Sequence, residues 1–186
     1  MTHAHTSRNR LSTRQICAIS AMGAIVCFMT AIPRIPIPLG YAHLGNAAIF
    51  LAVTFVGRRE GIFAGCIGSA LADLIGGFPL WVGPTLIIKF LMADTFWRVA
   101  LKNGEPPAGT SEASHSSSNL RTIAGLVLAG LVMAAGYTAF GALLYDSIEA
   151  GLASTPGLLM EGAVNAIVFF FAKAALQRAG VTRYWK

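Results

Sequence analysis

Several charged or strongly polar side chains lie inside long apolar stretches of this sequence, where they could do chemistry. They are Asp73, Lys89, Asp94, Arg98, Glu161 and Asn165. A charge at the centre of a membrane span costs about 2.5–3.5 kcal/mol or more, so it needs a partner or a wet cavity. Asp94 and Arg98 are four residues apart, which places them on one helix face and predicts an ion pair between them.

Asp73 and Lys89 lie in consecutive apolar stretches, at positions that predict a similar depth in a membrane. Two compatible interpretations follow: a buried ion pair that locks two helices together, or groups that face a ligand cavity. Glu161 and Asn165 are also four residues apart and predict one polar stripe on a helix. Capping or packing explains Glu161 as well as ligand contact does, whereas for Asn165 we favour a ligand role.

Further polar and aromatic groups stand in the first and third connections between apolar stretches, and at the starts of the stretches that follow them. They are Tyr41, His43, Asn46, Trp81 and Thr85. An interfacial belt of aromatic residues is a common explanation for the rings. The convergence of several such groups on the same side favours instead a pocket that opens outward.

Catalysis is not expected from this sequence. It contains no HExxH, GxSxG or Walker A motif, and no paired acidic metal motif. Cys17, Cys27 and Cys66 lie within apolar stretches without CxxC spacing, so we interpret them as packing residues rather than metal ligands or a disulfide. The sequence therefore predicts neither an enzyme nor a resident cofactor or metal.

The elements that must position these groups follow from composition. Hydrophobic residues make up 55% of the 186 residues and charged residues 12%, about half the share usual in soluble domains. The apolar stretches span about residues 15–32, 44–56, 61–78, 84–101, 122–145 and 157–176. We therefore predict an all-α membrane protein, a bundle of six transmembrane helices over residues 15–176. The second stretch is short, because a span needs about 20 residues.

The connections carry their own signals. Prolines in 33–38 predict a stiff, extended loop, with Gly40 allowing a turn. Small residues throughout the third stretch predict close helix packing. Residues 102–120 predict a flexible cytoplasmic linker, and 146–156 a polar loop. Polar tails are expected at 1–14 and 177–186.

The distribution of basic residues predicts the orientation. Of the 14 Lys and Arg residues, all except Arg34 and Lys89 fall in the two tails and in the second and fourth connections. Six spans place these segments on one side, which the positive-inside rule makes cytoplasmic. Both termini are therefore expected in the cytoplasm. The net charge of +6 does not suggest a nucleic-acid partner, because the basic residues cluster between apolar stretches.

Four segments together carry a family resemblance: 35–41 (IPIPLGY), 43–46 (HLGN), 65–73 (GCIGSALAD) and 84–89 (PTLIIK). In order and spacing the chain resembles, over about residues 12–176, the S components of energy-coupling factor (ECF) vitamin transporters, in particular the riboflavin-type group. The resemblance implies a protein of the prokaryotic plasma membrane that binds a vitamin or related precursor from outside. It also implies a membrane coupling (T) subunit and two ATP-binding-cassette ATPases as partners, which topple the S component to carry the ligand inward.

The resemblance implies site residues as well. Ligand contacts are expected from Tyr41, His43, Asn46, Asp73, Trp81, Thr85, Lys89 and Asn165, with the first outer loop as a lid. In the family, small residues of the first helix face the coupling subunit. Here the matching pairs are Cys17 with Ala21 or Ser20 with Ala24, and ordinary internal packing of that helix is the alternative.

The ligand itself is not fixed by the resemblance. A lysine and an arginine near the pocket would suit an anionic or carbonyl-bearing ligand, although Asp73 could neutralise Lys89. A stand-alone secondary transporter is the alternative function, against which stands the lack of an evident inverted repeat.

Overall fold

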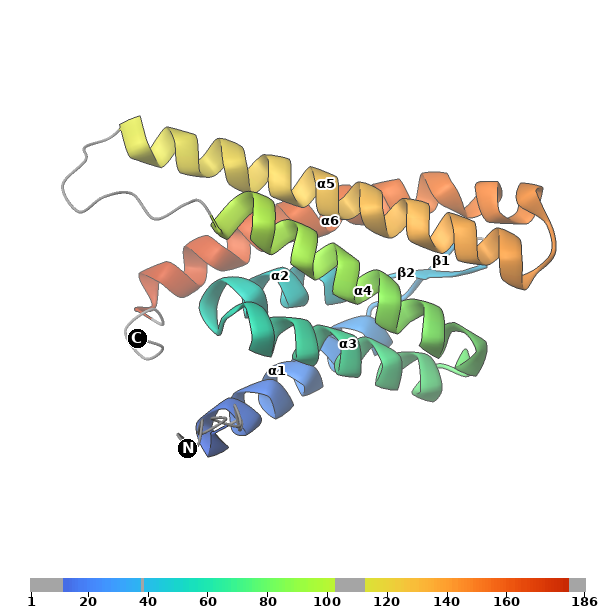
Figure 1. Cartoon of the computed structure of the whole chain (residues 1–186), viewed down its shortest axis with the longest axis horizontal. Coiled ribbons are helices and arrows are strands. Elements are labelled where there is room, and N and C mark those ends of the chain that lie inside the picture. Colours follow the sequence, from blue (N-terminus) through green and yellow to red (C-terminus); the bar gives the residue numbers. More distant parts are fainter. Residues whose placement is uncertain (1–11, 38, 103–112, 181–186) are drawn as a thin grey trace, which may run out of the picture.

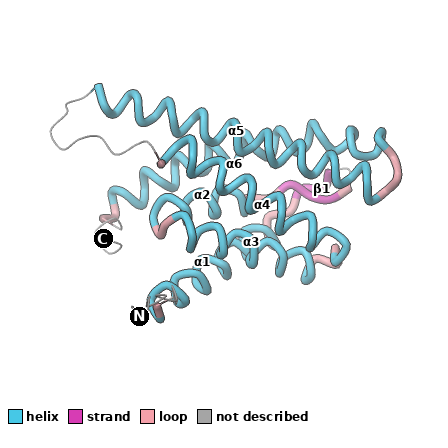
Figure 2. Tube along the Cα trace, viewed as in Figure 1, coloured by secondary structure: helices cyan, strands magenta, loops and turns pink. Residues whose placement is uncertain are grey.

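The computed structural model describes residues 12–37, 39–102 and 113–180, and these residues are almost entirely helical (Figures 1 and 2). The elements are α1 (Thr13–Ala31), β1 (Ile35–Ile37), β2 (Gly40–Ala42), α2 (Gly45–Phe55), α3 (Arg58–Ile75), the 3-10 turn η1 (Pro79–Trp81), α4 (Val82–Phe96), the π-helical η2 (Trp97–Leu101), α5 (Ala113–Leu144) and α6 (Ile148–Arg178). The predicted all-α class is confirmed, with one small hairpin added.

The helices form a layered bundle (Figure 1). Helices α5 and α6 lie side by side, α4 packs between α5 and α3, and α1 packs along α3 on the far side from α5. The short helix α2 contacts α1, α3, α4 and α6, and most of its 11 residues are buried. Helix α2 is thus enclosed by the other helices.

Small residues permit the close packing that the sequence predicts. A Cβ added to Gly61 of α3 would lie only 2.5 Å from the backbone nitrogen of Val53 in α2. One added to Gly68 would meet the carbonyl oxygen of Gly23 in α1. Helix α3 therefore touches both neighbours backbone to backbone, as membrane helices with small interfacial residues do.

Within the described part of the chain, three helices are long and apolar enough to cross a membrane by length and composition: Thr13–Ala31, Asn119–Leu144 and Ile148–Arg178. Helix α2 is apolar but shorter, with 11 residues. Helix α3 (18 residues) and helix α4 carry buried polar groups, including Asp73, Lys89 and Asp94.

Two predicted loops are shorter than the sequence indicates. The polar loop expected at 146–156 is wrong from Ile148 onward, because Ser147 caps α6 by accepting a 3.1 Å hydrogen bond from the Ala150 N–H. Pro156 lies inside this helix, where it removes one backbone donor and crowds the carbonyl of the preceding turn. The linker expected at 102–120 is likewise helical from Ala113.

The chain ends and the middle of that linker lie outside the described residues, namely 1–11, 103–112 and 181–186. Helix α1 begins just after Ser12, whose hydroxyl accepts from the Gln15 N–H while the Gln15 side chain accepts from the Ser12 N–H. This capping box fixes the start of the first helix two residues before the predicted one.

The proline-rich stretch forms an antiparallel hairpin. Its register pairs Ile35 with Ala42 and Ile37 with Gly40, so the predicted extended backbone is confirmed for 35–37. The residue with left-handed φ is Leu39, at 62°, rather than Gly40. The hairpin lies at the end of the bundle away from the start of α1 and the end of α6, together with the α3–α4 and α5–α6 connections (Figure 1).

Candidate functional site

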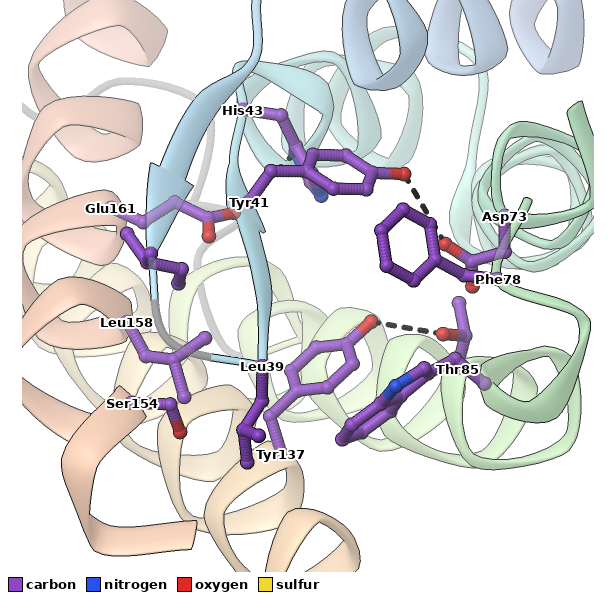
Figure 3. A pocket seen from close by; sticks show the side chains of 12 residues that line it. Leu39, Tyr41, His43, Asp73, Phe78, Thr85, Tyr137, Ser154, Leu158 and Glu161 are labelled. Carbon is purple, nitrogen blue, oxygen red and sulfur yellow. Dashed lines mark hydrogen bonds and ion pairs between the residues drawn. The ribbon is translucent and has the colours of Figure 1, made fainter. Parts of the chain in front are cut away.

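A pocket lies between the hairpin and helices α3 to α6, at the hairpin end of the bundle. Its lining residues are Ile37, Leu39, Tyr41, His43, Asp73, Phe78, Trp81, Thr85, Tyr137, Ser154, Leu158 and Glu161 (Figure 3). The empty space within it, including the open mouth, is about 510 Å³.

Aromatic rings form much of the pocket wall. The ring centroids of Tyr41 and Phe78 are 5.4 Å apart, and those of Trp81 and Tyr137 are 5.6 Å apart. The Arg34 guanidinium lies over the Tyr41 ring, 4.4 Å from the ring centroid. Rings at such spacings offer flat, polarisable surfaces suited to a planar organic ligand.

Two hydrogen bonds link the polar groups at the pocket surface (Figure 3). The Tyr41 hydroxyl donates to Oδ1 of Asp73 at 3.4 Å, and the hydroxyls of Thr85 and Tyr137 are 3.1 Å apart. Burial and the nearby Asp73 carboxyl raise the pKa of Tyr41 to about 12. The phenol therefore keeps its proton at physiological pH and can act as the donor that joins the hairpin to α3.

A buried polar chain runs beneath the pocket. Nζ of Lys89 donates to Oδ1 of Asn46 at 2.6 Å, and Nδ2 of Asn46 donates to Oε1 of Glu161 at 2.7 Å. Lys89 and Asn46 are each 1% exposed. In the described part of the chain no ion pair joins Lys89 to Asp73, so the interpretation as a locking ion pair is wrong. The Lys89 ammonium is instead directed to the amide of Asn46 in α2.

Asn165 holds three elements together without lining the pocket. Its Oδ1 accepts from the Ala47 N–H at 2.8 Å, and its Nδ2 donates to the carbonyls of His43 at 2.7 Å and Glu161 at 2.9 Å. The residue is fully buried. Asn46, Lys89 and Asn165 thus lie one layer below the five predicted residues that do line the pocket: Tyr41, His43, Asp73, Trp81 and Thr85.

His43 connects the pocket surface with this lower layer. Its Nδ1 accepts from the Gly45 N–H at 3.1 Å and lies 3.4 Å from Oε1 of Glu161. Burial, together with the positive charge of Lys89, lowers the pKa of His43 well below 6.5. The ring is therefore neutral near pH 7 with Nδ1 as an acceptor, and its contact with Glu161 is not an ion pair.

Some lining residues were not among the predicted ligand contacts. Glu161 is part of the polar stripe that the sequence predicts, but it was not assigned to the site, and Tyr137 was not among the predicted contacts. Ser154, Leu158 and Glu161 follow one another at intervals of four and three residues, so they share one face of α6. That spacing was hidden by placing the start of this helix after Pro156. Ile37 and Leu39 carry no sequence signal beyond their place in the proline-rich stretch.

The predicted pair of Asp94 and Arg98 is confirmed. Nε of Arg98 lies 2.6 Å from Oδ2 of Asp94, and Arg58 binds the other oxygen of the same carboxyl at 2.6 Å. Arg58 also stacks over Trp97, 4.8 Å from its ring centroid. This cluster ties the start of α3 to the end of α4 and takes no part in the pocket.

The predicted partner face of α1 points away from the bundle. Cys17, Ser20, Ala21 and Ala24 are all exposed. The inward face of the helix is formed by other residues: Ala18, Gly23, Val26 and Thr30. Internal packing of α1 therefore does not use the predicted face.

Among the residues that the structure describes, no group of three or more His, Cys, Asp or Glu side chains is placed to hold a metal ion. The arrangement that the structure does show is one for binding: a cavity with aromatic walls, a few polar groups and a buried hydrogen-bonded support.

A bundle of apolar helices that builds such a pocket defines a membrane protein of the solute-binding kind. Comparison with known families makes this specific: residues 10–178 match the model of the family described as ECF-type riboflavin transporter, S component. The chain belongs to this family. It is therefore the substrate-specific subunit type of an ECF transporter and not an enzyme.

A relative at the sequence level is an uncharacterized protein in the gap 3′ region of Pyrococcus woesei. It is 37% identical over 123 residues, which cover 64% of this chain and 73% of the relative.

Proposed function

We propose that this S component binds a vitamin or vitamin-like small molecule in the pocket beneath the hairpin, and takes it up from outside the cell. The observation that carries the proposal is the pocket itself, with paired aromatic rings and a free carboxyl oxygen. Its position at the hairpin end, opposite the start of α1 and the end of α6, supports an opening on the outer side (Figure 1).

The orientation in the membrane is part of the proposal. We infer six spans with both chain ends in the cytoplasm of a prokaryotic cell. The support is that Arg14 lies near the start of α1, Arg58 at the start of α3 and Arg98 in η2, directly after α4. These segments share the end of the bundle opposite the hairpin (Figure 1). Basic residues collect on the cytoplasmic side of membrane proteins.

Orientation can be tested with an impermeant thiol reagent on intact cells, in a background in which all three native cysteines are replaced. A cysteine introduced at exposed Leu143, near the α5–α6 turn, should react, and one at exposed Arg59 should react only after cell lysis. The reverse pattern would overturn the orientation.

Partners follow from the family and from α1. We infer a complex with a membrane coupling (T) subunit and two ATP-binding-cassette ATPases. The sequence itself holds no Walker A motif, so ATP hydrolysis requires other chains. The exposed small residues Cys17, Ser20, Ala21 and Ala24 support α1 as the contact, because small side chains allow close approach of a partner helix.

The test is to purify the protein in detergent and identify small molecules that copurify with it by mass spectrometry. A thermal-shift panel of vitamins, with riboflavin as the first probe, then measures binding, because a ligand of the native state raises Tm. Trp81→Leu, in the pocket, should abolish the shift. Trp97→Leu, at the other end of α4, should retain it. A protein that copurifies with no vitamin and is stabilised by none would overturn the proposed function.

A further inference from the structure

A second cavity of the molecule is an apolar groove between α5 and α6. It shares no lining residue with the pocket at the hairpin, and all eight residues that line it are apolar. They include Val127 and Gly130 of α5 and Gly162, Ala163 and Ala166 of α6. The empty space in the groove, including its open side, is about 500 Å³.

The groove is shaped by small residues and faces the surroundings of the bundle. A Cβ added to Gly162 would lie 3.6 Å from Cα of Gly130, so the two helix backbones approach closely at this point. Larger side chains form the rims, and Val127, Leu131 and Leu159 are 54%, 49% and 45% exposed. In a membrane, such exposed apolar side chains meet lipid, so the groove opens toward acyl chains rather than toward water.

A lysine stands beyond one end of the groove. Leu159, Ala166 and Lys173 follow one another at intervals of seven residues, about two helical turns, so they share one face of α6. Lys173 is partly buried, and its Nζ lies 5.8 Å from the ring centroid of Phe169. In the parts of the chain that the structure describes, no carboxyl group lies within ion-pair distance of this ammonium. The face that forms the groove therefore leads to a cation that no protein anion neutralises.

The spacing of these residues fits the depth of one membrane leaflet. At a rise of 1.5 Å per residue, Lys173 lies about 10 Å along α6 from Ala166 and about 21 Å from Leu159. The hydrocarbon of one leaflet is about 15 Å deep, half of a core of about 30 Å. A phospholipid whose phosphate meets the Lys173 ammonium therefore has an acyl chain long enough to lie in the groove.

The position of the groove argues against the coupling subunit as its occupant. Helix α1, the proposed contact with that subunit, packs along α3 on the far side from α5 (Figure 1). The groove is thus not a continuation of that contact. A phospholipid also supplies both parts that this face requires, because it joins a flexible apolar chain to an anionic group at a fixed depth.

We propose that the groove between α5 and α6 retains one phospholipid with an anionic headgroup, its acyl chain against Gly130 and Gly162 and its phosphate at the ammonium of Lys173. This lipid site is separate from the pocket for the transported solute. The inference therefore does not depend on which solute the pocket binds.

The experiment is native mass spectrometry of the detergent-purified protein, titrated with palmitoyl-oleoyl phosphatidylglycerol or with the zwitterionic phosphatidylcholine of the same chains. The unmodified protein should bind one phosphatidylglycerol more tightly than phosphatidylcholine. Ala163→Phe fills the groove from an exposed position and should abolish this binding. Lys173→Gln should weaken phosphatidylglycerol about fivefold and change phosphatidylcholine less.

Two matched variants control for size and charge. Ala153→Phe adds the same ring at an exposed position of α6 outside the groove, and Lys102→Gln removes an exposed lysine at the end of η2. Both should bind phosphatidylglycerol as the unmodified protein does. Should Ala163→Phe not fold, Ala166→Leu fills the same groove with a smaller side chain.

Three results would overturn the inference. The first is equal affinity of the unmodified protein for the two lipids, and the second is full retention of phosphatidylglycerol by the groove-filling variants. The third is a protein dimer that the same variants dissociate, which would make a second copy of the chain the occupant. Solute binding by Ala163→Phe, followed by thermal shift, should persist in every case, so these results leave the proposed function intact.

Discussion

Nζ of Lys89 and Oδ1 of Asn46 are 2.6 Å apart, and both side chains are shut off from solvent. Because the same Asn46 amide donates to Glu161, it connects a cation on α4 with a carboxyl on α6 through the first turn of α2. An amide can serve both because it carries a carbonyl acceptor and an NH₂ donor. The pocket above therefore stands on a hydrogen-bonded support rather than on a direct ion pair.

Removal of the ammonium should destabilise the protein. Lys89→Met keeps most of the side-chain volume but leaves the Asn46 carbonyl unpaired and Glu161 without a nearby cation. We expect a loss of about 2–3 kcal/mol of unfolding free energy, measured as a lower Tm in detergent. Lys102→Met is the control, since Lys102 is exposed at the end of η2. Equal Tm values for the two variants would contradict the role given to Lys89.

Close helix packing gives a second prediction. Gly61→Ala places a methyl group against the backbone of Val53 and should destabilise the protein by about 1–3 kcal/mol. Gly83→Ala is the matched control, because no atom lies within 4 Å of the added Cβ and alanine favours a helix over glycine. A Gly61→Ala protein as stable as Gly83→Ala would show that α2 and α3 can separate at no cost.

His43 predicts the pH dependence of stability. Stability rises with pH wherever the unfolded chain binds more protons than the folded one. Because the folded pKa of His43 lies well below 6.5, the unfolded imidazole takes up a proton first as the pH falls. Stability should therefore decrease as the pH drops below 6.5, down to the folded pKa.

The measurement compares Tm of the unmodified protein and of His43→Gln at a series of pH values from about 7.5 to about 5. The glutamine variant should show the smaller decrease, since its side chain does not titrate. Titratable groups that do not contact His43 are the same in both proteins and cancel in the comparison. Identical slopes would rule out a depressed pKa for His43.

The exposed face of α1 gives a prediction for transport. Ala21→Trp or Ala24→Trp should abolish vitamin uptake by cells that also express the ATPases and coupling subunit, because the bulky ring blocks close helix approach. Binding by the purified variant should remain, since both alanines point away from the bundle. Ala153→Trp, on an exposed position of α6, should leave uptake intact. Loss of binding in Ala21→Trp would place this face inside the fold.

The helical class could be predicted from the sequence because apolar stretches and small residues act locally. The start of α6 could not, since Pro156 reads as a helix boundary until the Ser147 cap is known. The start of α5 was missed for a related reason: the serines before Leu120 favour a loop in isolation. The strand pairing in the hairpin also depends on contacts that the proline spacing does not reveal.

The site could be predicted from the sequence only in part. Five predicted residues line the pocket because they stand at helix ends and in the hairpin, which meet at one end of the bundle. Lys89 and Asn165 were expected at the surface of the cavity, yet their side chains turn to α2. The sequence indicates how deep a residue lies in the membrane, but the direction of its side chain depends on the neighbouring helices. The partner of Lys89 is separated from it by 43 residues, so no local pattern identifies it.

Helix α2 has a consequence for how the protein is made. With 11 residues it is too short to leave the translocation channel and settle in lipid on its own. Gly57, with a φ of 132°, turns the chain directly from α2 into α3, and the contact of Gly61 with Val53 joins the two helices across that turn. The two should therefore partition into the bilayer as one helical pair during synthesis, so that a substitution at Gly57 that disturbs this turn would appear first as failed membrane insertion.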